Sequence, residues 1–361
     1  MGRLRVAIVG CGWVSGSHME EGYKQLPDAF DVLACCDRDR ERAETFGRTH
    51  DVPRRVASVA DVLAMPDIDV VDICTPPMLH ADMVEATLRA GKHAICEKPF
   101  AESLARLDAI AQLEAASPGR VMPIFQYRFG TEATRVRHAI TSGLCGRAFV
   151  SSVETMWLRG SDYYEVQWRG KFASELGGVL LTQSIHMHDL LLWLLGPAAR
   201  VSAFKSTRVN PIEVEDCAAV ALVMADGSLA TLTATLGSVQ QITRFRLVFE
   251  NCTWECLAEG AGNVGNPGAA AWRLWPKTHE IGVAIEAAMS EVRPVRSRFA
   301  GQFESFSQAI ETGAAFAVTL DDARRSLELI TAAFHSHAAG IAVPLPVGAD
   351  HPLYRGWTPS P

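Results

Sequence analysis

The chain has 361 residues, which is more than one domain usually holds, so we expect two domains rather than a single large one. Hydrophobic residues make up 48% and charged residues 21%, a composition that excludes an intrinsically disordered chain. The net charge of −7 and the absence of a long apolar stretch argue against nucleic acid and membrane as partners.

The first thirty residues have the pattern of a strand, a glycine-rich turn and a helix. Residues 4–9 are apolar and rich in β-branched side chains, as in a buried parallel strand, and residues 17–26 can form a helix. Between them, GCGWVSG is close to the dinucleotide-binding fingerprint, with Ser15 at the third glycine position. The helix amides would face a pyrophosphate. We therefore expect cofactor contacts at Gly10, Cys11, Gly12, Trp13 and Val14.

The residues after the second expected strand, 31–36, bear on the choice of cofactor. Asp37 lies 27 residues after Gly10, where a carboxylate can accept hydrogen bonds from the adenosine ribose and repels a 2′-phosphate. This favours NAD. The adjacent Arg38 can pair with a 2′-phosphate, so NADP stays the alternative cofactor.

Strands and helices continue to alternate through residue 125. The expected helices are 58–65, 81–90 and 103–116, and the expected strands are 70–74, 93–96 and 121–125. This alternation predicts a parallel, doubly wound sheet, that is, a Rossmann domain over residues 1–125. Ligands of such sheets bind beyond the carboxyl ends of the strands. The loops at Gly10, Asp37, Thr75, Glu97 and Gln126 should therefore converge on one cleft.

The rhythm changes after residue 148, where period-2 alternation replaces the βα pattern. Strands are expected at 148–155, 200–209, 217–224, 228–236 and 245–249, with an Asp-Gly hairpin turn at 225–228. Helices are expected at 302–311 and 320–337. We predict a C-terminal α/β domain over 126–347 with a large, mostly antiparallel open sheet. Residues 260–267 are expected to form a loop, and 348–361 an extended tail.

One helix of this domain should carry polar residues on a largely leucine-rich segment. In GGVLLTQSIHMHD, His186 and Asp189 fall on one side of a helix, and Thr182 lies one turn before His186. His188 points about 200° away from His186 around the helix, which argues against a shared metal ion. Cys252 and Cys256 lack neighbouring partners, so we expect no metal site.

The chain resembles the Gfo/Idh/MocA oxidoreductases. The matching segments are VAIVGCGWVSGSH, DICTPPMLHADM, CEKPF, FQYRF, GGVLLTQSIHMHDLLLWLLG and VTLDDARRSLELITAAFHS, which run from residue 6 to about 347. The resemblance implies that Lys98 lies at the reaction centre, and such a lysine can polarise the substrate oxygen. It also implies that Glu97 contacts the ribose. Thr75, Pro76, His80 and Gln126 are expected beside the cofactor, and backbone contacts are the alternative for His80.

This chain departs from the family pattern at position 182. The family usually has Asp there and His one turn later, and the pair handles the substrate proton; here Thr182 precedes His186. A hydroxyl can hydrogen-bond but cannot stabilise an imidazolium as a carboxylate does. Three alternatives stay open. His186 acts alone as general base with Lys98 assisting, Thr182 contacts a substrate hydroxyl or a water, or the usual chemistry is lost.

We therefore predict an NAD(P)-dependent dehydrogenase or reductase acting on a secondary alcohol of a sugar, polyol or sugar acid. The expected substrate-binding residues are Lys98, Arg128, Tyr164, Trp168, Arg169, Thr182 and His186, and ordinary packing is the alternative for the aromatic ones. The other functions considered are action on a dihydrodiol, an imine or a glycoside, and a non-catalytic NAD(P)-binding sensor.

Two expectations concern the state of the protein. The open sheet face in this family is commonly an oligomer interface, so we expect a homodimer or homotetramer through the C-terminal sheet. Nine cysteines, an odd number without CxxC spacing, fit reduced thiols and a cytoplasmic protein.

Overall fold

The computed structural model describes residues 2–259 and 266–357, which form two compact units. The first unit comprises Met1–Gln126 and Phe299–Arg324, and the second comprises Tyr127–Arg298 and Arg325–Pro361. Each unit is built from two separate segments of the chain, whereas the predicted domains, 1–125 and 126–347, are continuous. Those bounds stay a prediction about folding domains.

The first unit contains a six-stranded sheet in which every pairing is parallel. Its order is β3-β2-β1-β4-β5-β6. The strands are β1 (Leu4–Val9), β2 (Phe30–Cys36), β3 (Arg54–Val56), β4 (Val70–Ile73), β5 (His93–Cys96) and β6 (Val121–Pro123). β4 is buried throughout and β1 nearly so, as short apolar runs covered on both faces require. The predicted Rossmann topology is confirmed.

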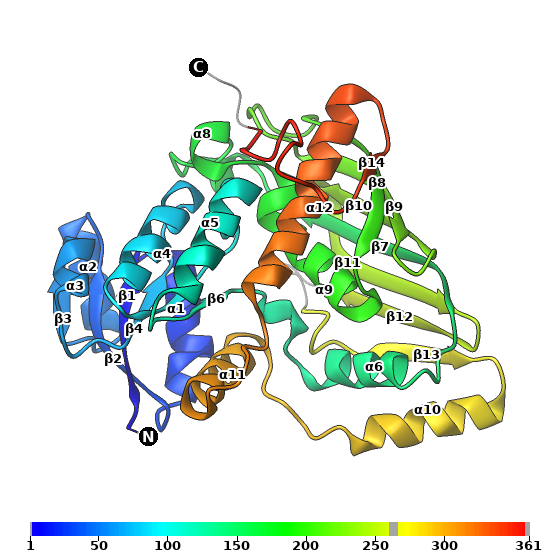
Figure 1. Cartoon of the computed structure of the whole chain (residues 1–361), viewed down its shortest axis with the longest axis horizontal. Helices are drawn as coiled ribbons and strands as arrows, with labels where there is room; N and C mark the ends of the chain where they lie inside the picture. Colours follow the sequence, from blue (N-terminus) through cyan, green and yellow to red (C-terminus); the bar gives the residue numbers. More distant parts are fainter. Residues whose placement is uncertain (1, 260–265, 358–361) are drawn as a thin grey trace. The chain divides into compact units, whose positions relative to one another are not determined.

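Six helices accompany this sheet (Figure 1). They are α1 (Trp13–Glu21), α2 (Arg40–Thr49), α3 (Val59–Leu63), α4 (His80–Arg89), α5 (Leu104–Ala115) and α11 (Arg298–Thr312). The prediction of a first helix over 17–26 was wrong in its bounds. Gly12 takes an extended conformation, so α1 begins directly after it, and a 3₁₀ turn at Tyr23–Gln25 follows Gly22. The sequence analysis did not identify α2 or β3.

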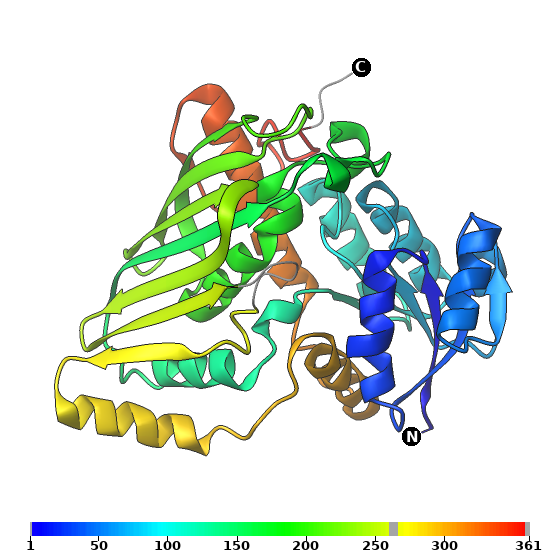
Figure 2. The same cartoon turned by 180° about the vertical axis from the view of Figure 1, so that it is seen from behind.

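Helix α11 comes from far along the chain but belongs to the first unit, where it lies beside α1 (Figures 1 and 2). Gln302 joins it to the end of β6, because its Oε1 accepts the Phe125 N–H at 3.2 Å and its Nε2 donates to Pro123 O at 2.8 Å. Phe299, Phe303 and Phe306 are fully buried. They supply an aromatic layer of the first unit's core.

The second unit contains an eight-stranded mixed sheet. Its order is β13-β12-β11-β7-β10-β9-β8-β14, and the β7–β10 pair is parallel while the other pairs are antiparallel. The strands are β7 (Ala148–Leu158), β8 (Ala198–Ser206), β9 (Cys217–Met224), β10 (Leu229–Thr235), β11 (Gly237–Phe249), β12 (Cys252–Glu259), β13 (Trp272–Pro276) and β14 (Val343–Pro344). The mostly antiparallel sheet and the hairpin at Gly227, with φ of 86°, are confirmed. Strands β12 to β14 were not predicted.

Helices cover one face of this sheet (Figure 2). They include α6 (Thr131–Thr141), α9 (Ile185–Leu195) and the part of α12 (Leu320–Ala339) that begins at Arg325; α7 (Ser161–Tyr164), α8 (Phe172–Glu175) and α10 (His279–Glu291) complete the unit. Among the described residues no helix covers the other face, where Phe204 is 76% exposed. The face is apolar at further positions, namely Val150, Leu229 and Leu257.

Two predicted irregular segments have different outcomes. Most of the loop expected at 260–267 lies outside the described residues. The tail is not extended as predicted, because residues 349–355 form turns and the Trp357 Nε1–H donates to Leu176 O at 2.7 Å. The ring of Trp357 packs on Phe334 with ring centroids 4.9 Å apart. An aromatic contact and a hydrogen bond therefore hold the tail against the second unit.

All nine cysteines are free, and eight of them are buried. Within residues 2–259 and 266–357, no helix has both the length and the apolar character that crossing a bilayer requires.

Candidate active site

The glycine-rich turn is forced by its contact with the neighbouring strand. Gly10 has φ of 94°, and a Cβ at this position would lie 2.7 Å from Cys74 O. Because of both its backbone angle and this close approach, only glycine lets the chain pass from β1 across the end of β4.

The backbone at the start of α1 has open space beside Gly12. Gly12 precedes the helix, no side chain caps it, and its first turn carries no acidic residue. A Cβ at Gly12 would have no neighbouring atom within 4 Å. Ser15 is fully buried and its hydroxyl donates to Gly12 O at 2.7 Å, so serine fills the third glycine position without crowding the turn. A helix start of this kind suits a phosphate group.

Asp37 connects the end of β2 to this turn. Its Oδ2 accepts the Cys11 N–H at 3.0 Å, and its Oδ1 accepts the Asp39 N–H at 2.9 Å. Arg38 is exposed. These bonds fix the Asp37 carboxylate at the edge where the sequence places the ribose, whereas the guanidinium of Arg38 lies in solvent.

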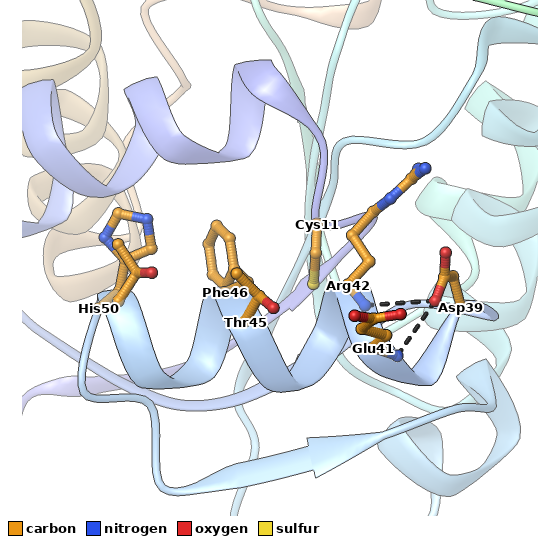
Figure 3. Close-up of a pocket in the computed structure, with 8 residues that line it drawn as sticks. Cys11, Asp39, Glu41, Arg42, Thr45, Phe46 and His50 are labelled. Atoms are coloured by element: carbon orange, nitrogen blue, oxygen red, sulfur yellow. Dashed lines mark hydrogen bonds between the residues drawn. The ribbon is translucent and has the colours of Figure 1, made fainter.

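A pocket of about 440 Å³ lies between the turn and α2 (Figure 3). It is lined by Cys11, Asp39, Glu41, Arg42, Thr45, Phe46, Thr49 and His50. Asp39 caps α2 at this pocket, where its carboxylate accepts the Glu41 and Arg42 N–H groups at 3.0 and 3.2 Å. Cys11 is the one lining residue that also belongs to the expected cofactor set, and none of the expected catalytic residues lies here.

His80 ties two loops of the first unit together. The ring is buried, with Nδ1 2.7 Å from Pro99 O and Nε2 2.8 Å from Thr75 O. Burial lowers the pKa of His80, although both carbonyl contacts oppose that effect. The sequence left two roles open for His80, contact with the cofactor and contact with the backbone, and the structure has the backbone contacts. Its contact with the cofactor stays a prediction, as do those of Thr75 and the half-buried Pro76.

Lys98 lies in the turn that follows β5. It is half-buried, its N–H donates to Glu97 Oε2 at 3.1 Å, and the Lys98–Pro99 peptide bond is cis. Glu97 is buried, and its other carboxylate oxygen contacts His18. The sequence analysis missed His18, because 79 residues separate the two.

The residues of the first unit fit a dinucleotide. A side chain at Gly10 would clash with the backbone of Cys74, and one at Gly12 would fill the open space beside the turn. The amides at the start of α1 suit an anion. Gln126 adds a buried Oε1 that has no hydrogen-bond partner among the described residues, as expected of an amide that faces a ligand.

The second unit carries Thr182 and His186 on two consecutive helical segments. Residues Val179–Gln183 form a π-helical turn, and α9 begins at Ile185. The Thr182 hydroxyl lies 2.6 Å from Gln183 Oε1 and 3.0 Å from Gly178 O, so its single proton is directed toward the protein. His186 is buried, and its ring stacks on Tyr127 at a centroid distance of 4.8 Å.

The other polar residues of α9 belong to the core. Asp189 and Arg128 form a buried, bidentate ion pair, with Arg128 Nε 2.6 Å from Asp189 Oδ2. The substrate role expected of Arg128 stays a prediction. His188 is buried, and burial lowers its pKa to about 3, so its ring is neutral.

The expected substrate residues near 163–169 form a stacked cluster. The Arg169 guanidinium lies over the rings of Tyr163 and Trp168 at 3.8 and 4.4 Å, and it donates to Tyr163 OH. Tyr163 OH also accepts from Gln183 Nε2 at 3.0 Å, which links the cluster to the neighbour of Thr182. Tyr164 packs edge-on against Tyr163 at 5.1 Å. The sequence analysis singled out the aromatic and basic residues of this segment, Tyr163 included, but not Gln183, which links them to Thr182.

A buried carboxylate that the sequence did not indicate lies at the same segment. Glu215 Oε1 accepts the N–H groups of Gly178 and Leu180 at 3.0 and 3.2 Å. Burial raises the pKa of Glu215 to about 7, against the opposing charge of Lys205. The predicted residues are thus gathered in two groups, one within each unit.

Two family profiles match most of the chain. Residues 4–125 match the family described as "Oxidoreductase family, NAD-binding Rossmann fold", and residues 133–255 match the "GFO/IDH/MocA C-terminal domain". The first description confirms NAD as the expected cofactor.

Curated relatives include an inositol dehydrogenase and a D-apiose dehydrogenase. An inositol 2-dehydrogenase from Rhizobium meliloti is 27% identical over 93% of this chain and 97% of its own length. A D-apiose dehydrogenase from Paraburkholderia graminis is 29% identical over 66% of this chain. The chain spans only 62% of that enzyme's length.

Solved structures share the fold over almost the whole chain. The WlbA dehydrogenase from Bordetella pertussis, solved with NADH and UDP-GlcNAcA, has a TM-score of 0.84 at 24% identity, covering 96% of this chain and 99% of that one. Levoglucosan dehydrogenase with NADH has a TM-score of 0.78 at 21% identity, covering 95% and 99%.

Proposed function

The chain belongs to the GFO/IDH/MocA oxidoreductase family, and from that premise we propose that it oxidises a secondary alcohol of a sugar, polyol or sugar acid with NAD. The observation that carries the proposal is the Glu97–Lys98 turn, which follows β5 in the NAD-binding unit. The relatives that act on inositol and D-apiose support a polyhydroxylated substrate. Reduction of the corresponding ketone is the same reaction reversed.

The first unit would hold the cofactor at two places. The amides at the start of α1 would bind the pyrophosphate, and Asp37 would accept hydrogen bonds from the adenosine ribose. When bound, NAD supplies the hydride acceptor. The protein's part is to orient the substrate and to move the hydroxyl proton.

Lys98 is assigned to the substrate oxygen. An ammonium donates a hydrogen bond and carries a positive charge, so it stabilises the negative charge that develops as the alcohol loses its proton. Its N–H bond to Glu97 limits the movement of the backbone that bears this side chain.

His186 is assigned to the proton. Stacking on Tyr127 fixes the ring plane, which suits a general base that must accept a proton in one direction. Thr182 cannot supply the charge of the usual Asp, so the imidazolium formed here lacks that stabilisation. Introducing the carboxylate by Thr182→Asp should raise the pKa of His186 and move the acid limb of the pH–rate profile up by about one unit. An unchanged profile would show that position 182 does not influence proton transfer.

The test of the proposal is absorbance at 340 nm with NAD and NADP against inositols, aldoses including D-apiose, and sugar acids. We expect reduction of NAD by at least one of them, and a loss of about 10²- to 10⁴-fold in kcat for Lys98→Met. The matched control is Lys24→Met, which removes a partly exposed lysine that pairs with Glu20. Undiminished turnover in Lys98→Met would overturn the role of Lys98.

The same assay separates the other functions considered. Turnover of only dihydrodiols, imines or glycosides would place the chain elsewhere in its family's chemistry. Tight NAD binding without turnover of any of these would favour a sensor, for which the Asp-to-Thr difference at position 182 is the supporting observation.

We further propose that a second copy of the chain packs on the open sheet face. Phe204 and Leu229 are 76% and 52% exposed there, and such a patch is costly in water. Light scattering after chromatography should give at least twice the mass of one chain, and Phe204→Arg should lower it. The free thiols support a reducing, cytoplasmic location.

A further inference from the structure

His18 lies at the centre of a buried polar cluster in the first unit. Neither it nor Asp72 is exposed, and Glu97 is 4% exposed. Nδ1 of His18 lies 2.8 Å from Asp72 Oδ2, and Nε2 lies 3.1 Å from Glu97 Oε1. The ring therefore spans two carboxyl groups that come from β4 and from the turn after β5.

The number of protons in this cluster follows from its geometry. A neutral imidazole has one N–H and one acceptor nitrogen, and an ionised carboxylate only accepts. Both contacts of His18 can be hydrogen bonds only if one further proton is present, either on the ring or on a carboxyl group. With both contacts made as hydrogen bonds, this further proton lies between His18 and one of its two carboxyl partners.

Aromatic side chains shield the His18 cluster from solvent. The ring centroids of Phe299 and Phe303 in α11 lie 4.4 and 5.2 Å from the centroid of the His18 ring. Helix α11 lies beside α1 (Figure 1). Tyr23 donates its hydroxyl to Asp72 Oδ2 at 2.9 Å. The titratable groups that face the ring are Asp72, Cys74 and Glu97, while α11 contributes aromatic rings.

These groups set the charge of the ring. Burial alone lowers the pKa of His18, but the charge of Asp72 and the contacts with Cys74 raise it well above its ordinary value. Burial also raises the pKa of the Cys74 thiol to about 12. His18, Asp72 and Cys74 have atoms within 4.8 Å of one another, a spacing that suits a metal ion. Both ring nitrogens of His18 face carboxylate oxygens, at 2.8 Å from Asp72 and 3.1 Å from Glu97, and this arrangement describes a hydrogen-bond network.

The network reaches the backbone that bears the candidate catalytic lysine. Glu97 Oε1 contacts His18, and Glu97 Oε2 accepts the Lys98 N–H at 3.1 Å. On the other side of Lys98, the carbonyl of Pro99 lies 2.7 Å from His80 Nδ1. Lys98 is thus held on one side through Glu97 and His18 and on the other through Pro99 and His80.

We propose that His18 is a positioning residue for Lys98, acting through the proton it shares with the carboxyl group of Glu97. His18 orients Glu97, and Glu97 fixes the backbone N–H of Lys98. The consequence for turnover rests on the proposed function, because it takes Lys98 to act on the substrate. The effect on the Lys98 backbone N–H does not depend on the proposed function.

Two variants at position 18 separate this role from simple filling of space. Glutamine places an amide near the position of Nε2, so His18→Gln can still donate to Glu97. Asparagine is shorter and places its amide near Nδ1, so His18→Asn keeps the contact with Asp72 and loses the one with Glu97. The control for the chemical change is His138→Asn, at a partly exposed histidine of the second unit.

The first measurement is hydrogen exchange of the Lys98 amide by NMR, with and without NAD. We expect at least tenfold faster exchange in His18→Asn and less than a threefold change in His18→Gln and His138→Asn. Equal exchange in wild type and His18→Asn would overturn the proposal. So would equal acceleration in both position-18 variants, since a merely structural role predicts a common loss that follows thermal stability.

The second measurement is steady-state kinetics with NAD and the fastest substrate of the panel above. His18→Asn should lower kcat at least tenfold and leave the Kd for NAD within threefold, and His18→Gln should recover most of kcat. If exchange changes as expected but Lys98→Met retains full turnover, the proposed function fails and the positioning role stands. If Lys98→Met loses turnover but His18→Asn leaves exchange of the Lys98 amide unchanged, the positioning role fails and the proposed function stands.

Discussion

The two candidate catalytic residues, Lys98 and His186, are held by different means. In the first unit, the backbone of Lys98 is bonded to a carboxyl group that belongs to a network of His18, Asp72 and Tyr23, whose members share partners. In the second unit, the helix of His186 is anchored by one bidentate ion pair between Arg128 and Asp189. A shared network distributes its stabilisation over several residues, whereas an ion pair concentrates it in two. Single substitutions should therefore have unequal effects in the two units.

The largest effect is expected at the ion pair. Arg128→Met leaves the buried Asp189 carboxylate without its guanidinium and should lower the free energy of unfolding by about 3–5 kcal/mol. Urea denaturation measures the loss. Arg135→Met, at an arginine that pairs with Glu132 on partly exposed α6, serves as control and should cost less than about 1 kcal/mol. A loss below 1 kcal/mol in Arg128→Met would contradict the concentration of stability in this pair.

The second effect should have the opposite sign and depend on pH. The pKa of Glu215 is raised from its ordinary 4.5 to about 7, so the folded state holds this proton more tightly than the unfolded state. Its stabilising effect is present below about pH 4.5 and is lost as the pH rises through 7. Glu215→Gln resembles the protonated form and should be more stable than wild type at pH 8 by up to about 3 kcal/mol, with little difference at pH 4.5.

Unfolding at several pH values between 4.5 and 8 tests this expectation. Glu213→Gln changes an exposed glutamate two residues away and should leave the pH dependence of wild type intact. Parallel stability curves for wild type and Glu215→Gln would show that Glu215 titrates normally in the folded protein.

The smallest effect is expected in the shared network. Tyr23→Phe removes the hydroxyl that donates to Asp72, but the Asp72 carboxylate keeps its bond to His18. The expected loss is about 0.5–1.5 kcal/mol in the free energy of unfolding, the net value of a typical hydrogen bond, because Asp72 keeps its other partner. Tyr164→Phe in the second unit provides the comparison. A loss as large as that of Arg128→Met would mean that the network does not redistribute its contacts.

Local patterns account for what the sequence could predict. Strand β1, the glycine turn and Asp37 follow from residues that are neighbours in the chain, and the structure adds the reason that Gly10 must be glycine. Helix α2 escaped prediction because its sequence, RERAETFGRT, is mostly charged and polar and buries only Ala43, Phe46 and Gly47. Because so few of its residues are apolar, no apolar run marked this segment as a helix, although the apolar residues it has share one side.

The remaining features depend on contacts between distant residues. His18 meets Asp72 and Glu97 across 54 and 79 residues, and no local spacing marks these three as a group. Thr182 was expected on a regular helical turn, yet it lies in a π-helical turn whose N–H groups at Gly178 and Leu180 are bound by Glu215. The residue roles at both sites stay predictions that the experiments above address.

The membership of α11 in the first unit has a consequence for synthesis on the ribosome. Phe299 and Phe303, which cover the ring of His18, are translated more than 170 residues after Gln126, where the first segment of that unit ends. At about 5–20 residues per second, the nascent Rossmann sheet would wait roughly 10–40 s for its last helix. Until then, the ionisable groups around His18 would remain hydrated, and a fragment that stops at Gln126 would keep them so permanently. The first unit therefore cannot complete its fold in the order in which it is made.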